Sequence, residues 1–424
     1  MPHFLLTGLG ARLGKAGVLL AGLVNPPLTL AQEQSPLNWL PFGECNAAHW
    51  SSNRNLDDRQ DTVAASCHFS AKPKLTPEVA LGLNVRAGWQ DNLGADSASH
   101  RVREAYIGWA SDAWSLRLGR QIISWGRADG INPTDRLAPK DFTLLSADDE
   151  SQRQGIDAAT LRFGATAAIS VSLTAAQFSA HITPQGSLPA NLARPPEPTD
   201  VEWALKLDYN GQGLDWSVSL FDGYDRFTRY SLDLSNPKAP LFQGDFERAR
   251  SFGADFAFAT GAFTWRGEFS HSVLRPGCGT CALHERRVSR AVLGGDLDFA
   301  STMNLNFQVF GNRHWDYQAP TTAAGLLQAL QTGRNLLNRE FAEFETGVTL
   351  RLSDRIFNDK LKWEIAAVFD TTGGSRAIRP RMTYTFNDHF KLNAGMDFLE
   401  GDSQTHFGSF NKNRLAYVLF GWVF

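Results

Sequence analysis

The side chains that could carry covalent or metal chemistry are scattered along the chain. The histidines lie far from one another, and none stands at a readable spacing from a serine and an acid: His49, His68, His181, His271, His314, His389 and His406. A hydrolytic triad assembles in space, yet no spacing here favours one, and no spaced set of carboxylates forms a calcium loop. The sequence therefore predicts no enzyme activity and no resident metal or cofactor.

The four cysteines offer a second kind of chemistry. In an exported protein an even number suggests disulfides, which here would join Cys45 to Cys67 and Cys278 to Cys281. The second pair also has the CxxC spacing of a zinc half-site or a redox centre. No second CxxC motif and no βαβ context accompany it. The sequence therefore favours a disulfide that staples a loop.

The densest group of polar side chains lies between residues 116 and 153. Glycine and proline force turns in this stretch, and Asn or Asp side chains bond to their own backbone at turn starts. Arginines alternate with acids throughout, so we expect an ordered, salt-bridged loop. Its candidate functional residues are Arg120, Gln121, Trp125, Arg127, Asp129, Asn132, Asp135, Asp141 and Arg153.

The elements that must position this loop are strands. From about Val79 onward, runs of about ten residues alternate apolar and polar side chains, which point to opposite faces of a strand. Near the end of the chain, for example, Phe390 and Leu392 alternate with Lys391 and Asn393. About sixteen such runs begin near residues 79, 101, 113, 155, 166, 201, 213, 249, 261, 287, 302, 340, 361, 376, 389 and 413.

The breaks between these runs alternate in length. Short breaks such as Ser111-Asp112 and Asn387-Asp388 separate long ones such as 122–153 and 312–338. Outer-membrane barrels have short periplasmic turns and long extracellular loops. A β-sandwich rarely strings together so many long strands, and a propeller would show a repeat of about 40 residues. After the N-terminal segment the sequence contains no run of about eighteen apolar residues, so it predicts no membrane-spanning helix.

The sequence therefore predicts an all-β fold located in the bacterial outer membrane. We expect a transmembrane antiparallel up-and-down β-barrel of about 16 strands over residues 78–424, ending on a C-terminal phenylalanine. Phe420, Trp422 and Phe424 share one face of the last strand. An aromatic final residue preceded by alternate apolar positions is similar to the signal that the barrel-assembly machinery reads.

The N-terminal part divides into two segments. Arg12 and Lys15 precede a short apolar stretch that ends before Thr29-Leu30-Ala31, which predicts a signal peptide over 1–31 with cleavage after Ala31. The segment 32–77 lacks clear alternation. It is interpreted as a periplasmic extension, a partial plug of the pore, or an extra strand around residues 62–69.

Charges on a lipid-facing position are costly, so the polar face of each strand should line the lumen. The main lumen candidates are Arg86, Glu104, Arg117, Arg162, Lys206, Arg266, Arg379 and Arg381. Basic and acidic residues nearly balance over the whole interior, which argues against strong overall ion selectivity. Local groups such as Arg379 with Arg381 could still form a wall of one sign.

The polar stretch also carries a family resemblance. The strings LRLGRQ, WGRAD and NPTD, preceded by Arg103-Glu104-Ala105-Tyr106 and followed by Arg153, resemble the proteobacterial outer-membrane family DUF1302 over residues 101–160. The GRQ string is also similar to alginate-export porins. The chain differs from DUF1302 in a tighter stretch between Asp129 and Asn132. The resemblance implies a barrel that passes material across the outer membrane.

These observations together predict a porin-like channel for a specific solute, such as a hydrophobic small molecule, with loop 122–153 folded inward as a constriction or gate. The alternatives are a loop that only caps the mouth, a polysaccharide-export conduit, and a plugged structural or adhesive barrel. Expected partners are outer-membrane lipid and lipopolysaccharide, the barrel-assembly machinery, and an inner-membrane transporter or periplasmic protein. The net charge of −3 argues against a nucleic-acid partner.

Overall fold

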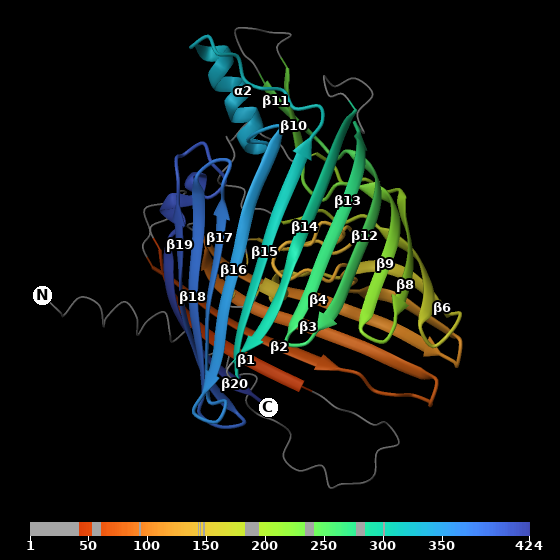
Figure 1. Ribbon diagram of the computed structural model, residues 1–424. Helices are drawn as coiled ribbons and strands as arrows, with labels where there is room; N and C mark the ends of the chain where they lie inside the picture. The colour runs from red at the N-terminus through yellow and green to blue at the C-terminus, as the bar shows by residue number, and fades with distance from the viewer. Residues whose placement is uncertain are drawn as a thin grey trace, which may run out of the picture.

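The computed structural model is a closed antiparallel β-barrel (Figure 1). It describes residues 42–52, 61–92, 95–142, 144, 146, 149–182, 195–233, 241–276, 285–299 and 302–424. The expected signal peptide and the expected Cys278–Cys281 disulfide lie outside the described residues. No helix in the described part is long and apolar enough to cross a membrane.

The barrel wall is one sheet of 18 strands, each paired with two neighbours, and β1 pairs with β20 to close the ring. The strands are β1 (Phe42–Ser52), β2 (Asp61–Ala71), β3 (Val79–Asn92), β4 (Ala95–Ala110), β5 (Trp114–Gln121), β6 (Ile156–Gly164), β7 (Ile169–Gln177), β8 (Val201–Asn210), β9 (Leu214–Tyr224), β12 (Arg248–Thr260), β13 (Phe263–Arg275), β14 (Arg286–Phe299), β15 (Met303–His314), β16 (Phe344–Ile356), β17 (Leu361–Asp370), β18 (Ser375–Thr385), β19 (Phe390–Glu400) and β20 (Leu415–Val423).

The expected count of about sixteen strands is therefore wrong by two. The sixteen predicted runs correspond to β3–β9 and β12–β20, and the two further strands, β1 and β2, lie in the segment 32–77. The barrel accordingly begins at Phe42 and not near residue 78. Small side chains explain why the alternation was hard to see, because Ala47 and Ala48 of β1 lie opposite Ala65 and Ala64 of β2. The extra strand expected around 62–69 is β2.

Loop length differs between the two ends of the barrel, as expected. One end has short turns, such as 111–113 and 211–213, and it also holds Phe42 and Phe424. There Gly43 N–H donates to Phe424 O at 3.0 Å, so the ends of the described chain meet at the seam. The other end carries the long loops, with the hairpin β10 (Arg229–Asp233) and β11 (Leu241–Asp245) and the helix α2 (Leu326–Leu337) rising above it (Figure 1).

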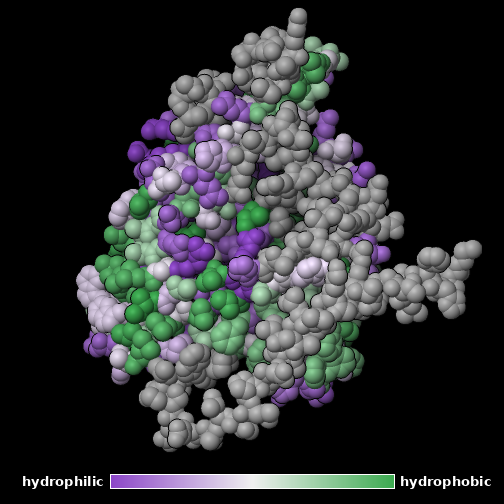
Figure 2. Space-filling model, turned by 180° about the vertical axis from the view of Figure 1, so that it is seen from behind, coloured by the Kyte–Doolittle hydropathy of each residue, from purple (hydrophilic) through white to green (hydrophobic). Residues whose placement is uncertain are grey.

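The outer face of the barrel is apolar. Alternate strand residues point outward and keep large exposed fractions, including Trp203 at 51% and Val418 at 52%. Apolar side chains gather over the lower part of the surface and hydrophilic ones lie above them (Figure 2). Soluble proteins rarely expose so large an apolar patch. Phe420 and Phe424 of the expected assembly signal are also exposed on this face.

The expected Cys45–Cys67 disulfide is present and joins two directly opposed residues of β1 and β2. The bond closes a loop with a sequence separation of 22 residues. Chain entropy predicts that such a cross-link stabilises the fold by about 3 kcal/mol. We expect the Cys45→Ser/Cys67→Ser variant to lose about this much in guanidinium unfolding. A variant that unfolds at the wild-type midpoint would show that the bond adds nothing to stability.

Candidate functional site: a lumen divided by an inner loop

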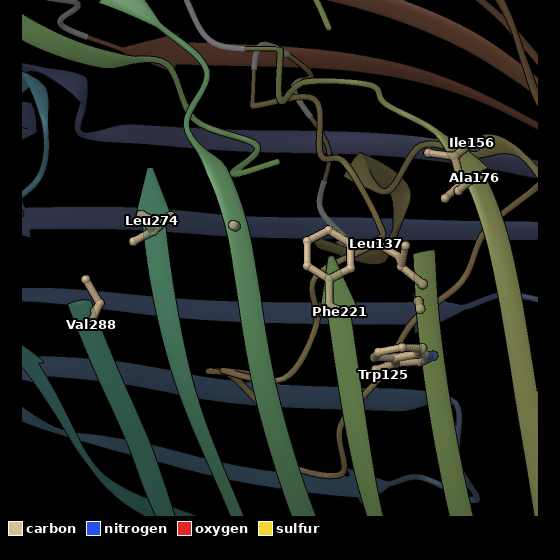
Figure 3. Close-up of a cluster of buried hydrophobic side chains, with 9 residues drawn as sticks. Trp125, Leu137, Ile156, Ala176, Phe221, Leu274 and Val288 are labelled. Atoms are coloured by element: carbon tan, nitrogen blue, oxygen red, sulfur yellow. The ribbon is translucent and has the colours of Figure 1, made fainter. Parts of the chain in front are cut away.

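The connection between β5 and β6 does not cap the mouth but turns into the barrel. This segment, residues 122–155, is named the inner loop. Its Trp125 and Leu137 pack against Phe221, Leu274 and other buried side chains of the wall (Figure 3). Leu137 is 1% exposed. The loop also reaches well below the mouth, because Arg127 lies 3.7 Å from Asp208, near the short-turn end of β8.

A buried carboxylate on the wall holds the tip of the inner loop. Glu268 of β13 accepts hydrogen bonds from the backbone N–H of Ala128 at 2.6 Å, the backbone N–H of Thr134 at 3.2 Å and the Thr134 hydroxyl at 2.8 Å. Gly126 has a φ of +96°, and a Cβ there would collide with the Glu268 carboxylate. The turn can therefore lie against the wall only with glycine at this position.

Two charged side chains of the loop reach different parts of the wall. Arg127 pairs with Asp255 of β12 and lies 3.7 Å from Asp208 of β8. Asp129 pairs with Arg351 of β16 at 2.7 Å. These contacts join the loop to strands on either side of β13. The loop is thus fastened along one part of the wall, from β8 to β16.

The returning limb of the loop is held by a second group of ion pairs. Arg153 pairs with Asp135 and with Glu150. Burial would lower the pKa of Arg153, but the two carboxylates outweigh it and raise that pKa. Asp141 is buried and pairs with Arg101 at 3.1 Å. The guanidinium of Arg103 donates to the backbone of this limb.

The inner loop is also joined to other extracellular loops. The backbone N–H of Lys140 donates to His181 Nδ1 at 2.8 Å, and the His181 ring lies 4.3 Å from the ring of Phe227. Arg339 stacks over Phe227 at 4.0 Å. Burial lowers the pKa of His181 to about 3, so its imidazole stays neutral and able to accept this bond at neutral pH. Four loops are thus fastened into one unit.

A cavity of about 440 Å³ lies between the inner loop and the opposite wall. Strands β1–β4 and β18–β20 form that wall, and Leu144, Ser146, Glu150 and Ser151 form the loop side. Four basic residues line the cavity, against the two acids Glu44 and Glu150: Arg86, Arg103, Arg381 and Lys391. His68 adds a further polar group.

Charge pairing differs between the two walls. On the loop-covered wall Lys206 lies 2.8 Å from Asp208, and Arg266 lies 2.7 Å from Asp296. On the cavity wall Lys391 pairs with Glu44 at 2.8 Å. Arg86 instead donates to the Ser66 hydroxyl at 3.3 Å and forms no ion pair with any carboxylate of the described residues. Among the described residues that line the cavity, basic side chains thus outnumber acidic ones.

Most predicted loop residues take part in this arrangement, but Arg120 does not. Arg120 lies within β5 and pairs with Asp157 of β6, and it shares the outward direction of Leu118. Gln121 is also in β5; it is 1% exposed and donates to Ala158 O at 2.9 Å. Asn132 accepts a hydrogen bond from the Asp135 N–H within the loop. The interpretation of Arg120 as a constriction residue is wrong, because its side chain lies on the outward face of β5, opposite Asp157 of β6.

The predicted lumen residues lie in different surroundings. Arg86 and Arg381 line the cavity, whereas Arg379 lies 3.6 Å from Asp397. Glu104 accepts a hydrogen bond from Ile122 N–H at the root of the inner loop. The others are placed by a neighbour on the wall: Arg117 stacks over Tyr106 at 4.5 Å, Arg162 donates to Ser170 at 2.9 Å, and Lys206 and Arg266 lie on the loop-covered wall.

Several cavity residues were missed. Glu44 and His68 lie on β1 and β2, the two strands that the alternation did not reveal. Arg103 lies beside a β-bulge, where the register of β3 and β4 shifts between Asn84 and Val85, so strict alternation misassigns it. Among the described residues no group of three or more His, Cys, Asp or Glu side chains is placed to hold a metal ion.

No family model and no curated protein matches the sequence. The resemblance to DUF1302 therefore stays a prediction.

Solved structures with a similar fold are outer-membrane porins. The structure of OccAB1 from Acinetobacter baumannii has a TM-score of 0.59 and 10% identity, covering 92% of this chain and 99% of that one. OccK2 from Pseudomonas aeruginosa, solved in complex with glucuronate, has a TM-score of 0.55 and 12% identity over 91% and 97%. OpdK from the same organism, solved with vanillate, has a TM-score of 0.54 and 11% identity, covering 91% of this chain and 98% of that one. At these low sequence identities the structural similarity shows a shared fold alone.

Proposed function

We propose that the chain is an outer-membrane channel that passes a small organic anion, with the inner loop as its constriction. The observation that carries this proposal is the cavity wall with more basic than acidic side chains. Arg86, in particular, has a planar guanidinium that can bind a carboxylate through two hydrogen bonds. The glucuronate and vanillate in the similar barrels are small organic acids of this class.

Two other functions are less well supported. A hydrophobic small molecule would leave the charged groups of the cavity without a counterpart, which is costly when they are desolvated. A polysaccharide-export conduit would need a wider passage than one that a fixed loop divides. The expected recognition of Phe424 by the assembly machinery, and an inner-membrane or periplasmic partner, remain predictions for the same channel.

Ion selectivity in planar bilayers tests the proposal. The wild-type channel in a salt gradient should give a reversal potential that shows preference for anions. The Arg86→Gln/Arg381→Gln/Lys391→Gln variant should shift this potential toward cation preference, because it removes the excess of basic groups. The matched control is Lys206→Gln on the loop-covered wall, which should leave the potential near the wild-type value.

Blocking by a solute separates a substrate channel from a general pore. Glucuronate added to one side should interrupt the wild-type current, and the triple variant should lose this block. A wild-type channel that conducts no ions would support a plugged barrel. A cation-selective wild-type channel, or equal shifts in the triple variant and the control, would overturn the proposal.

A further inference from the structure

The outer face of the barrel carries an apolar groove that the channel function does not use. Its cavity volume is about 430 Å³, within the size range of ligand pockets. The groove is lined by outward-facing side chains of adjacent strands, among them Leu173 of β7, Leu205 of β8, Leu220 of β9 and Phe252 of β12. Leu205 lies opposite both Leu173 and Leu220, and Leu220 lies opposite Phe252, so these four form one row across the wall.

Charged residues stand directly above this row, nearer the extracellular end. Arg250 precedes Phe252 by two residues on the same outward face, opposite Asp222. The Arg250 side chain is 64% exposed. It uses Nε to donate to Asp222 at 2.9 Å, and its two Nη atoms have no partner among the described residues.

Two arginines and two aspartates gather at this point, but the Nη atoms of Arg250 are not used by the carboxylates. The Asp222 carboxylate is shared between Arg250 and Arg248, whose Nη2 lies 2.7 Å from it. Asp200 lies 3.9 Å from Arg248 and accepts a hydrogen bond from the Tyr224 hydroxyl. The guanidinium of Arg250 is therefore open to an anion on the membrane side.

An apolar groove below an available guanidinium matches an amphiphile with an anionic head. Acyl chains are stabilised by burial against Leu and Phe side chains. Arginine binds phosphate oxygens in a bidentate manner, and basic side chains at a membrane surface attract anionic lipid. We propose that this groove is a binding site for a phosphorylated lipid of the outer leaflet. One acyl chain lies over Leu205 and Leu220, and the phosphate binds the Nη atoms of Arg250.

Arginines at other points of the rim provide a contrast. Arg376 of β18 also points outward near the extracellular end, with its Nε donating to Glu400 at 2.7 Å. Its side chain is 53% exposed. Arg376 does not line the apolar groove. Arg376 also donates through Nη2 to Glu400, so it is an outward-facing arginine that lacks both the groove and two unused Nη atoms.

Native mass spectrometry of the full chain in detergent tests the site, with diphosphorylated lipid A as the probe. We expect one tightly held lipid on the wild type and at least tenfold weaker binding in Arg250→Gln. Leu205→Trp, which fills the groove and leaves Arg250 intact, should weaken binding to a similar degree. The control Arg376→Gln should bind as the wild type does. Unchanged conductance shows that each variant is folded.

Four results would overturn the site. The first is wild-type protein that retains no lipid A, and the second is an equal loss in Arg250→Gln and Arg376→Gln. The third is unchanged binding when the phosphates are removed from the probe or when the groove is filled. Inorganic phosphate at the same concentration should fail to displace the lipid. Displacement by phosphate alone would show that the groove adds no affinity and would also overturn the proposal.

Discussion

Replacing residues 122–155 by a four-residue Gly/Ser linker is expected to raise the single-channel conductance severalfold. The loop occupies one side of an 18-stranded barrel, and barrels of about this size leave an aqueous channel when nothing fills them. The linker is geometrically feasible because Gln121 lies directly opposite Ile156 in the register of β5 and β6.

The control for this deletion is the folded state of the barrel. The shortened chain should keep the slow electrophoretic mobility of an unheated barrel and should still unfold cooperatively. A shortened, folded barrel with the wild-type conductance would contradict the constriction. Such a result would mean that current passes by a route that the inner loop does not border.

Replacing Glu268 by alanine is expected to lower the free energy of unfolding by about 4 kcal/mol, because it leaves three donors without an acceptor in a buried place. Glu268 is 4% exposed, so the three donors that lose this acceptor lie where water cannot easily replace it. The measurement is guanidinium unfolding of the folded barrel in lipid vesicles. The released loop should also add noise to the open-channel current.

Glu343→Ala is the matched comparison for Glu268→Ala. Glu343 lies 3.6 Å from Arg313, and its side chain is 62% exposed. Exposed ion pairs of this kind contribute less than about 1 kcal/mol. Equal losses in the two variants would show that Glu268 does not anchor the inner loop.

The strands could be predicted well because lipid and lumen impose opposite preferences on alternate residues. Where large apolar side chains carry this contrast, as in β8 and β20, the predicted runs match the strands. In β1 and β2 the alternate positions are largely small, such as Ala47 and Ala65, and they pack without an apolar signal. A strand built from small residues therefore looks like an irregular segment.

The inner loop was predictable in outline only. Its many charges predicted a salt-bridged loop, and Arg127, Asp129 and Arg153 do form ion pairs. The partners could not be inferred, because Arg127 and Asp129 pair with Asp255 and Arg351, which follow them by more than a hundred residues. Contacts across a closed barrel have no spacing that the sequence displays. Arg120 is a different case, since it shares one face of β5 with Leu116 and Leu118, and this alternation alone places it on the outward side.

The one-sided position of the inner loop has a consequence for which amino-acid substitutions this protein can accept. On the loop-covered wall, Glu268 and Asp255 have several partners each, so replacing them costs stability before it alters what passes. On the cavity wall, Arg86 has few partners, so replacing it costs little. A saturation-mutagenesis library selected for growth on different solutes should therefore gather its tolerated substitutions on β1–β4 and β18–β20. The barrel can acquire a new preference on one wall while the other keeps it folded.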